Sequence, residues 1–404
     1  MRRQALIFTV LALSAGLLPA PAVGRSSNSG PGVTKNEITI GLHMPMTGAV
    51  PISSQSAQHG ADVYWKWLRQ RNERIHGRYV EVVTKNDNYN PSQAVAVCKE
   101  MVEQDRVFLL TGIMQPAGVD QVQACARYAA SVGVPYVSLG STSARLKKLP
   151  RYFAITNTWR RQARMLADHL VTDLGARREK NGMLRHDTPH NAQVHDAFVR
   201  AMSKKRASLD YDRAVSRNAT QSEAQAVVQE MKAAGIRNVF ILSSPVWFLQ
   251  VLQASRAQDY RPRWVGIDGI PLSGDAVASV GCRNGTIGKS RFLSPLPAFE
   301  DRDSFDRMHD RAMRKVYDSE GDSVTWLGWA GSKAIRKMLR RTGRDLTRRS
   351  FATTVERMRR VRTNILPRFG FTPRDHFGGR GTHVLSVRCA DKRWVTVRRF
   401  VENF

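Results

Sequence analysis

The sequence predicts an α/β protein that folds as two consecutive lobes with a ligand cleft between them. Two observations carry this prediction. Apolar runs typical of buried strands alternate with helical patterns from residue 37 onwards, and this alternation occurs twice over similar lengths. Strands joined by helices of this length pair in parallel, with right-handed crossovers. At 404 residues the chain is long enough for two domains.

The first half contains predicted strands separated by amphipathic helices. The strands are expected at residues 37–42, 79–84, 106–112 and 134–139. A first helix is indicated by apolar residues that recur at helical spacing, namely Ala57, Ala61, Tyr64 and Leu68. Two further helices are expected at 90–104 and 118–133, the former with Pro91 and Ser92 at its start.

The second half repeats the pattern with shorter strands. The strands are expected at 152–156, 182–186, 212–217, 238–243 and 263–268. The helices between them are expected near 160–174, 191–204, 221–234 and 246–257. Residues 285–293 are expected to return the chain to the first unit. Helices near 303–317, 323–342 and 348–360 and a hairpin over 383–401, turning at 390–392, complete the chain.

The N-terminus indicates export. Residues 1–24 read as a signal peptide, with Arg2 and Arg3 before an apolar run and small residues near Ala22, and 25–35 as a polar linker. The protein is therefore expected in the periplasm or at the cell surface. No cysteine precedes Cys98, so no lipid-anchor cysteine is evident, and no later stretch is apolar for long enough to span a bilayer.

The composition is strongly basic, with a net charge of +29. The basic runs at 337–350 and 356–364 raise the hypothesis of a nucleic-acid interface. Their arginines alternate with apolar residues at helical spacing, which favours a solvated helix face, and an exported protein is not expected to bind nucleic acid. A cationic exterior also suits proximity to an anionic cell-wall polymer or lipid.

Three hydroxyl residues follow a predicted strand at residues 134–139. Gly140 is followed by Ser141, Thr142 and Ser143. A hydroxyl here can cap the next helix, and free N–H groups beside it can also hold a carboxylate. A nucleophile elbow, as in a secreted serine hydrolase, is disfavoured because Ser141 lacks the second glycine of GxSxG.

In order and spacing, the sequence resembles the periplasmic solute-binding proteins of the leucine/isoleucine/valine-binding type, which serve ABC importers. The resemblance rests on "EITIGLHMPMTGAV", "NDNYNPSQAVAVCKEMV", "LLTGIMQPAGVDQV", "GVPYVSLGSTSARL" and "WVGIDG", and returns faintly at "GFTPRDHFGG". It implies a type I periplasmic binding protein, with two Rossmann-like lobes joined by three crossovers near 155–159, 292–295 and 367–371. The first lobe is then expected at 36–156 plus 293–366, and the second at 157–292 plus 367–404.

The resemblance also implies a set of ligand-binding residues. In the first lobe, the family's α-carboxylate contact matches Thr142, beside Gly140 and Ser141, and Gln115 and Pro116 match positions that contact the same ligand. In the second lobe, Asp268 matches an acid that pairs with the ligand's ammonium group. Two aromatic contacts of the family are replaced, one by Asn191 and the other by Ser244, with Trp247 as a substitute wall. These replacements favour a more polar ligand.

Metal binding and cofactors are not expected. His186, Asp187, His190 and His195 offer metal-ligand chemistry, but their Pro-containing stretch lacks the HExxH spacing and is expected to be a solvated loop. The function implied is binding without chemistry: capture of an amino acid or similar solute and its delivery to ABC permease subunits. A ligand-sensing module of a membrane receptor is the alternative from another class, since it uses the same fold.

Four cysteines in an exported chain predict disulfides, and four allow three pairings. Cys98 and Cys125 lie on neighbouring helices of the first half, so they can meet on one face of its sheet. The resemblance assigns the C-terminal hairpin to the second lobe, which pairs Cys282 with Cys389. Each bridge then stays within one lobe and leaves hinge motion free.

Overall fold

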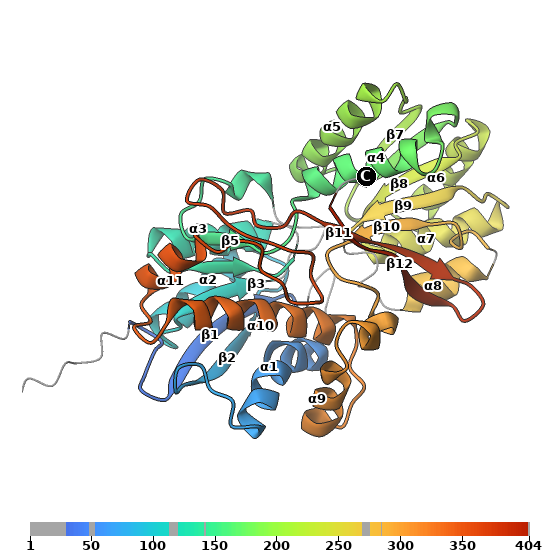
Figure 1. The fold of residues 1–404 in the computed structure, drawn as a ribbon. Helices are drawn as coiled ribbons and strands as arrows, with labels where there is room; N and C mark the ends of the chain where they lie inside the picture. The colour runs from blue at the N-terminus through green and yellow to red at the C-terminus, as the bar shows by residue number, and fades with distance from the viewer. Residues whose placement is uncertain are drawn as a thin grey trace, which may run out of the picture.

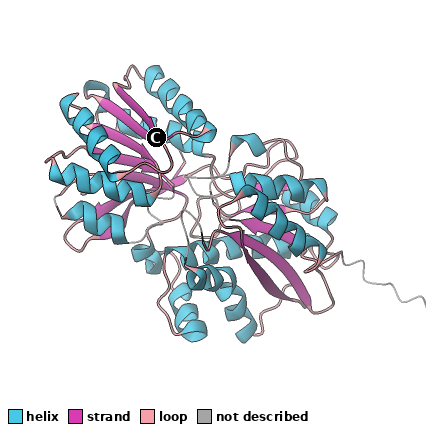
Figure 2. Ribbon diagram, turned by 180° about the vertical axis from the view of Figure 1, so that it is seen from behind, coloured by secondary structure: helices cyan, strands magenta, loops and turns pink. Residues whose placement is uncertain are grey.

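The two predicted halves form two separate sheets, each covered by helices on both faces (Figures 1 and 2). The structure is a computed structural model that describes residues 30–47, 53–112, 120–140, 143–268, 275–283 and 285–402. The predicted signal peptide lies outside these residues. Within the described ranges, no helix combines the length and the apolar character needed to cross a bilayer.

The first sheet has five parallel strands in the order β2-β1-β3-β4-β5. The strands are β1 (Glu37–Met44), β2 (Tyr79–Asn86), β3 (Leu109–Gly112), β4 (Tyr136–Ser138) and β5 (Tyr152–Ala154). Alternate residues of β1, from Ile38 to Met44, join one apolar core with α1 and α10, and α2 packs against α3 in another. The order places β1, the first strand in the chain, in the interior of the sheet.

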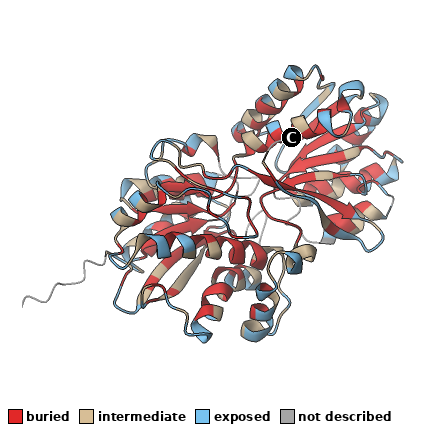
Figure 3. Cartoon of the chain, viewed as in Figure 1, coloured by how far each residue is buried: buried red, intermediate tan, exposed pale blue. Residues whose placement is uncertain are grey.

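The second sheet has seven strands in the order β12-β11-β10-β9-β8-β6-β7. Five of them run parallel: β6 (Asn181–His186), β7 (Tyr211–Val215), β8 (Asn238–Leu242), β9 (Arg263–Ile267) and β10 (Arg291–Ser294). The predicted hairpin forms β11 (Thr382–Arg388) and β12 (Arg393–Val401), and β11 adds antiparallel to β10. Strand residues in both sheets are largely buried (Figure 3).

The helices fall close to their predicted ranges. They are α1 (Ser54–Gln70), α2 (Pro91–Glu103), α3 (Asp120–Ser131), α4 (Trp159–Thr172), α5 (Pro189–Lys204), α6 (Gln221–Ala233), α7 (Pro245–Ala257), α8 (Asp275–Cys282), α9 (Met308–Tyr317), α10 (Ser323–Thr342) and α11 (Arg348–Val355). Local sequence explains several starts. α2, α5 and α7 each begin with proline after a residue whose side chain caps the first free N–H groups, namely Asn90, Thr188 and Ser244.

Three sequence-based expectations differ from the structure. Residues 285–293 were expected to return to the first unit, but β10 pairs with β9 and so belongs to the second sheet. α8 was not expected, and α11 ends at Val355 rather than near residue 360. The first and third differences arise because strand pairing and helix ends depend on neighbours that are distant in sequence.

The late helices return to the first sheet. α10 packs against α1 although more than 250 residues separate them, as the orange and blue helices of Figure 1 show. We call β1–β5 with α1–α3 and α9–α11 the first lobe, and β6–β12 with α4–α8 the second lobe. The predicted lobe boundary at residue 367 differs from this arrangement, because Phe371 is part of the first lobe's core and Phe377 bridges to Ala154 of β5.

Two disulfides lie within the lobes. Cys98 of α2 is bonded to Cys125 of α3, and Cys282 of α8 is bonded to Cys389 after β11. These are the two pairs that the two-lobe organisation predicts. Neither bridge joins one lobe to the other, so neither restricts their relative movement directly.

Candidate functional site

The candidate site lies where the parallel strands of the two sheets end. In open parallel sheets, ligands bind beyond the carboxyl ends of the strands. Four of the predicted site residues, Gln115, Pro116, Ser141 and Thr142, lie outside the described residues, so their roles stay predictions. Gly140 is buried, and its carbonyl oxygen accepts a hydrogen bond from the hydroxyl of Thr156.

In the second lobe, three predicted residues gather at the ends of β6 and β8. Asn191, on the first turn of α5, is fully buried and donates from Nδ2 to the carbonyl oxygens of His186 (3.1 Å) and Leu242 (3.4 Å). Ser244 caps α7 by accepting from the backbone N–H of Trp247 at 3.2 Å. Because β6 and β8 are neighbours, these short polar links bring the two strand ends and two helix starts into one cluster.

His186, the last residue of β6, joins Ser244 and Trp247 in this cluster. Its Nε2 lies 3.5 Å from the Ser244 hydroxyl, and its ring centroid lies 5.7 Å from that of Trp247. Its Nδ1 lies 3.1 Å from the carbonyl oxygen of Ser216. Burial lowers the pKa of His186, which favours the neutral imidazole, and the bond to Ser216 opposes this effect.

Two buried polar atoms beside His186 lack a partner in the part of the chain that the structure describes. They are Oδ1 of Asn191, an acceptor, and Nε1 of Trp247, a donor. Both residues are almost completely buried. Buried polar groups are normally hydrogen-bonded, because an unpaired one costs about 1–3 kcal/mol. An acceptor and a donor left open at adjacent strand ends are what a small polar ligand would fill.

Asp268 follows β9, the next strand of the sheet. It is 3% exposed, and its backbone N–H donates to the carbonyl oxygen of Leu293 at 2.7 Å. The strand order β9-β8-β6 therefore places Asp268, Ser244 and His186 along one edge of the second sheet. The sequence prediction had these residues at strand ends, but not the shared contacts of His186.

The histidines considered as metal ligands do not converge. His186 ends a strand, whereas His190 and His195 lie on α5, so the expectation of a solvated loop was wrong. His190 is buried against Trp159, with ring centroids 4.5 Å apart, and its nitrogens have no partner among the described residues. Burial, assisted by the nearby charge of Arg145, lowers the pKa of His190 to about 3.

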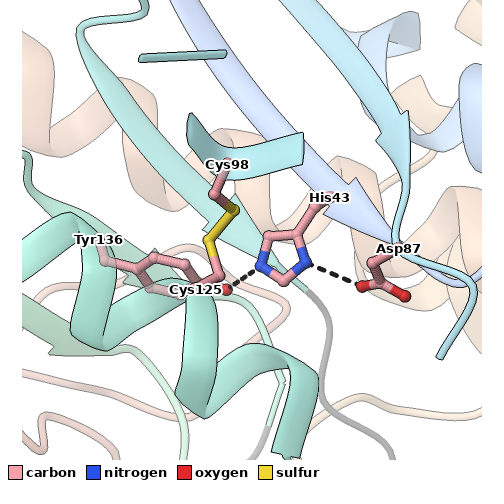
Figure 4. Close-up of a disulfide and its surroundings, with 5 residues drawn as sticks. All are labelled: His43, Asp87, Cys98, Cys125 and Tyr136. Atoms are coloured by element: carbon pink, nitrogen blue, oxygen red, sulfur yellow. Dashed lines mark hydrogen bonds and ion pairs between the residues drawn. A yellow bond between two sulfur atoms is a disulfide. The ribbon is translucent and has the colours of Figure 1, made fainter. Parts of the chain in front are cut away.

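In the first lobe, a chain of buried polar residues lies beside the disulfide (Figure 4). Nδ1 of His43, near the end of β1, lies 2.8 Å from Oδ2 of Asp87, and Nε2 lies 2.7 Å from the hydroxyl of Tyr136 on β4. An ionised carboxylate only accepts, so Nδ1 donates. Burial raises the pKa of the Tyr136 hydroxyl well above its usual value. These contacts were not predicted from the sequence, where the only signal is a histidine inside an apolar strand.

One group in the described part of the chain has the spacing of metal ligands. His43 and the sulfurs of Cys98 and Cys125 lie within 4.8 Å of one another. The two sulfurs are joined to each other and are therefore not the thiolates that a metal needs. The arrangement is best described as a disulfide packed on a histidine.

Among the polar contacts that join the lobes, two involve Arg217 and Arg145. Arg217, which follows β7, lies 3.4 Å from Asp120 at the start of α3. Arg145, between β4 and β5, donates to the side chain of Gln193 on α5 when the amide oxygen of Gln193 faces it, at 2.8 and 2.9 Å. Both contacts pair a residue of the first lobe with one of the second, so relative movement of the lobes would break them.

Comparisons with known proteins agree with this geometry. Residues 37–392 match a family model described as periplasmic binding protein. None of the curated proteins matches the chain in sequence. Among solved structures, the fatty acid ABC transporter substrate-binding protein from Thermomonospora curvata has a TM-score of 0.75 at 16% identity, covering 93% of this chain and 95% of that one.

Two further structures show the range of ligands on this fold. The branched-chain amino acid transporter substrate-binding protein LivJ from Streptococcus pneumoniae, in complex with isoleucine, has a TM-score of 0.73 at 15% identity, over 90% of this chain and 100% of that one. A solute-binding protein from Rhodopseudomonas palustris, in complex with 3,4-dihydroxybenzoic acid, has a TM-score of 0.73 at 15% identity, over 91% and 98%. At such identities the likeness shows the fold alone.

Proposed function

Because the chain belongs to the periplasmic binding protein family, we propose that it is the extracytoplasmic solute-binding component of an ABC importer. It captures an amino acid or a similar small polar solute between its lobes and delivers it to a membrane permease. The main observation in support is that two buried atoms at the strand ends of the second lobe, Oδ1 of Asn191 and Nε1 of Trp247, have no partner among the described residues. Export through the signal at residues 1–24 is part of the same proposal.

The site supports a polar ligand through its own chemistry. Oδ1 of Asn191 can accept from a ligand ammonium or hydroxyl group, and Nε1 of Trp247 can donate to a ligand oxygen. Asp268 adds an acid at the neighbouring strand end, which suits the positive end of a zwitterion. In the proposed site, Thr142 and Gln115 hold the anionic end from the first lobe.

The mechanism we propose is closure of the lobes around the solute, with no bond made or broken. A ligand that contacts both lobes binds the closed arrangement better and so shifts the population toward it. Interlobe contacts such as Asp120–Arg217 and Arg145–Gln193 add to the stability of a closed arrangement. Opening at the permease then releases the solute.

A thermal-shift screen tests the proposal. The solutes are the standard amino acids, small amides, and aromatic and fatty carboxylic acids. A ligand that binds only the folded protein stabilises it by about 2.7 kcal/mol at a concentration of 100 times Kd. We expect an amino acid or another small polar solute to raise Tm, and native mass spectrometry of the purified protein to identify any retained molecule.

Two results would contradict the proposal. One is that no small solute raises Tm while nucleic acid does. The other is turnover of ester or amide substrates that is lost when Ser141 is replaced by alanine. Asp268→Asn gives a further check, since it removes the negative charge while keeping the side chain's size, and it should weaken binding of a zwitterion more than that of a simple acid.

A further inference from the structure

A cavity lies at the junction of the lobes, apart from the strand-end cluster. Its volume is about 500 Å³, within the usual range for small-molecule sites, and its described lining contains none of Gly140, Asn191, Ser244, Trp247 and Asp268. Its basic side chains come from three segments: Lys147 after β4, Arg160, Arg161 and Arg164 of α4, and Arg380 before β11.

The three carboxylates that line this cavity are already paired. Asp168 lies 3.1 Å from Lys205, and Glu402 lies 3.2 Å from Arg368, both of which are outside the lining. Asp375 lies 3.0 Å from Arg380. Each acid of the cavity is therefore in an ion pair with another base, and Asp375 and Glu402 act on Arg161 only at longer range.

Four cationic side chains are left without an acid. Within the described residues, no carboxylate lies within 4.0 Å of Lys147, Arg160, Arg161 or Arg164. Nε of Arg160 is buried and has no hydrogen-bond partner there. The lining thus gathers positive charge around a space large enough for a ligand.

The start of α4 adds to this positive potential. Thr158 caps the helix, and its first turn contains no acid, so the positive end of the helix dipole is not compensated by a side chain. Burial lowers the pKa of Arg161, and the charges of Arg380 and Arg164 lower it further, against the opposing charges of Asp375 and Glu402. The guanidinium of Arg161 is thus held at a place where its charge is unfavourable.

We propose that this cavity is an anion-binding site that takes a small ligand carrying phosphate groups. Arginine forks bind phosphate oxygens in pairs, and a phosphate offers enough acceptor oxygens for several arginines and a lysine to share. A single carboxylate would leave most of these donors unpaired. Because Lys147 belongs to the first lobe and Arg161 to the second, the bound anion would touch both lobes.

The described lining of this cavity does not include Asn191, Ser244, Trp247 or Asp268, so anion binding is measured in the absence of solute. Binding of inorganic pyrophosphate is measured by calorimetry at constant ionic strength, with acetate as the single-charge comparison. The test variant is Arg161→Gln with Arg164→Gln. The matched control is Arg213→Gln with Arg256→Gln, which removes the same charge from two exposed arginines of the second lobe.

We expect pyrophosphate to bind the wild type and the control alike, and to bind the test variant at least about tenfold more weakly, the effect of losing a charged hydrogen-bond partner. Equal losses in both variants, or no binding to the wild type, would overturn the proposal. The test variant should fold, because neither arginine has an acidic partner among the described residues. Lys147→Gln, from the other lobe, provides an independent second variant.

The phosphate could come from a soluble ligand or from a lipid headgroup, and binding to vesicles distinguishes these two sources. A soluble ligand is indicated if pyrophosphate binds but phosphatidylglycerol vesicles do not. A lipid headgroup is indicated if these vesicles bind the wild type and the control but not the test variant, with phosphatidylcholine vesicles as the neutral comparison. If the wild-type protein binds pyrophosphate but none of the screened solutes, the proposed importer function is contradicted and the proposed anion site is not.

Discussion

A buried histidine stands near the end of the first strand of each lobe, and the two histidines have different surroundings. His43 of β1 has both ring nitrogens at hydrogen-bond distance from side chains, 2.8 Å from Asp87 and 2.7 Å from Tyr136. His186 of β6 has a longer link of 3.5 Å to Ser244, and beside it Asn191 and Trp247 each keep a polar atom without a described partner. Both ring nitrogens of each histidine have a partner, so the open polar atoms of the neighbours Asn191 and Trp247 are what distinguish the surroundings of His186.

The largest expected difference between the lobes is in the unfolding free energy lost when each disulfide is removed. Replacing Cys282 and Cys389 by alanine should cost about 5 kcal/mol of unfolding free energy, and replacing Cys98 and Cys125 about 3.5 kcal/mol, because the second lobe's bridge closes a loop of 107 residues and the first lobe's a loop of 27. Urea denaturation of both double variants measures the difference. The reverse order would mean that the packing of Cys98–Cys125 on His43 outweighs loop closure.

The second comparison replaces each of the two histidines by leucine. His43→Leu should cost about 3–5 kcal/mol, because it leaves the buried carboxylate of Asp87 and the Tyr136 hydroxyl without their partner. His186→Leu removes weaker links and should cost about 1–2 kcal/mol. Both values come from urea denaturation followed by circular dichroism. Equal costs would show that the two histidines do not differ in role.

A third comparison uses pH. The folded-state pKa of His190 is about 3, below the unfolded value of 6.5, so its contribution is fully present above pH 6.5 and is lost as pH falls toward 3. At pH 5 the loss relative to pH 7 should be about 2 kcal/mol. His190→Phe keeps the ring against Trp159 and should remove this part of the pH dependence, whereas His195→Phe on the same helix should not. Parallel pH profiles for wild type and His190→Phe would refute the assignment.

The fourth comparison concerns Trp247 and Trp264, whose indole N–H groups both lack a described partner. Trp247→Phe removes an N–H that has no described partner but also shrinks a buried side chain, so stability should fall about as much as in Trp264→Phe, while solute binding should weaken by about 1–2 kcal/mol. Trp264 is the matched control, because its Nε1 is also buried without a described partner and it belongs to the same apolar core, but it lies within β9 and not at a strand end. Calorimetry with the solute found in the thermal-shift screen should show unchanged affinity in Trp264→Phe. If both variants bind alike, Trp247 does not contact the solute.

The smallest expected effect is on solute affinity, from the ion pair between Asp120 of the first lobe and Arg217 of the second. Asp120 and Arg217 are about half exposed, so Asp120→Asn should weaken solute binding by less than about 1 kcal/mol, and the effect should shrink at high salt. Asp259→Asn removes an exposed pair within the second lobe and should leave affinity unchanged. An effect of Asp120→Asn that persists at 1 M salt would point to a role other than pairing with Arg217.

Local sequence determined most of the architecture. Apolar runs specified the strands because a parallel strand is buried on both faces, and Pro91 with Ser92 marked the start of α2 because a proline fits the first turn of a helix. The roles of Asn191 and Ser244 came from the family resemblance, whereas the strand end at Asp268 came from the local pattern. Such local patterns depend on residues only a few positions apart.

Only the tertiary structure decided which polar residues meet. His43, Asp87 and Tyr136 are up to 93 positions apart and come together because β2, β1, β3 and β4 are consecutive in the sheet. The assignment of β10 to the second sheet and the return of α10 to the first were likewise fixed by pairing and packing across long separations. The cluster of Arg161 with Lys147 and Arg380 follows from that assembly, since no local pattern records which acids are already paired.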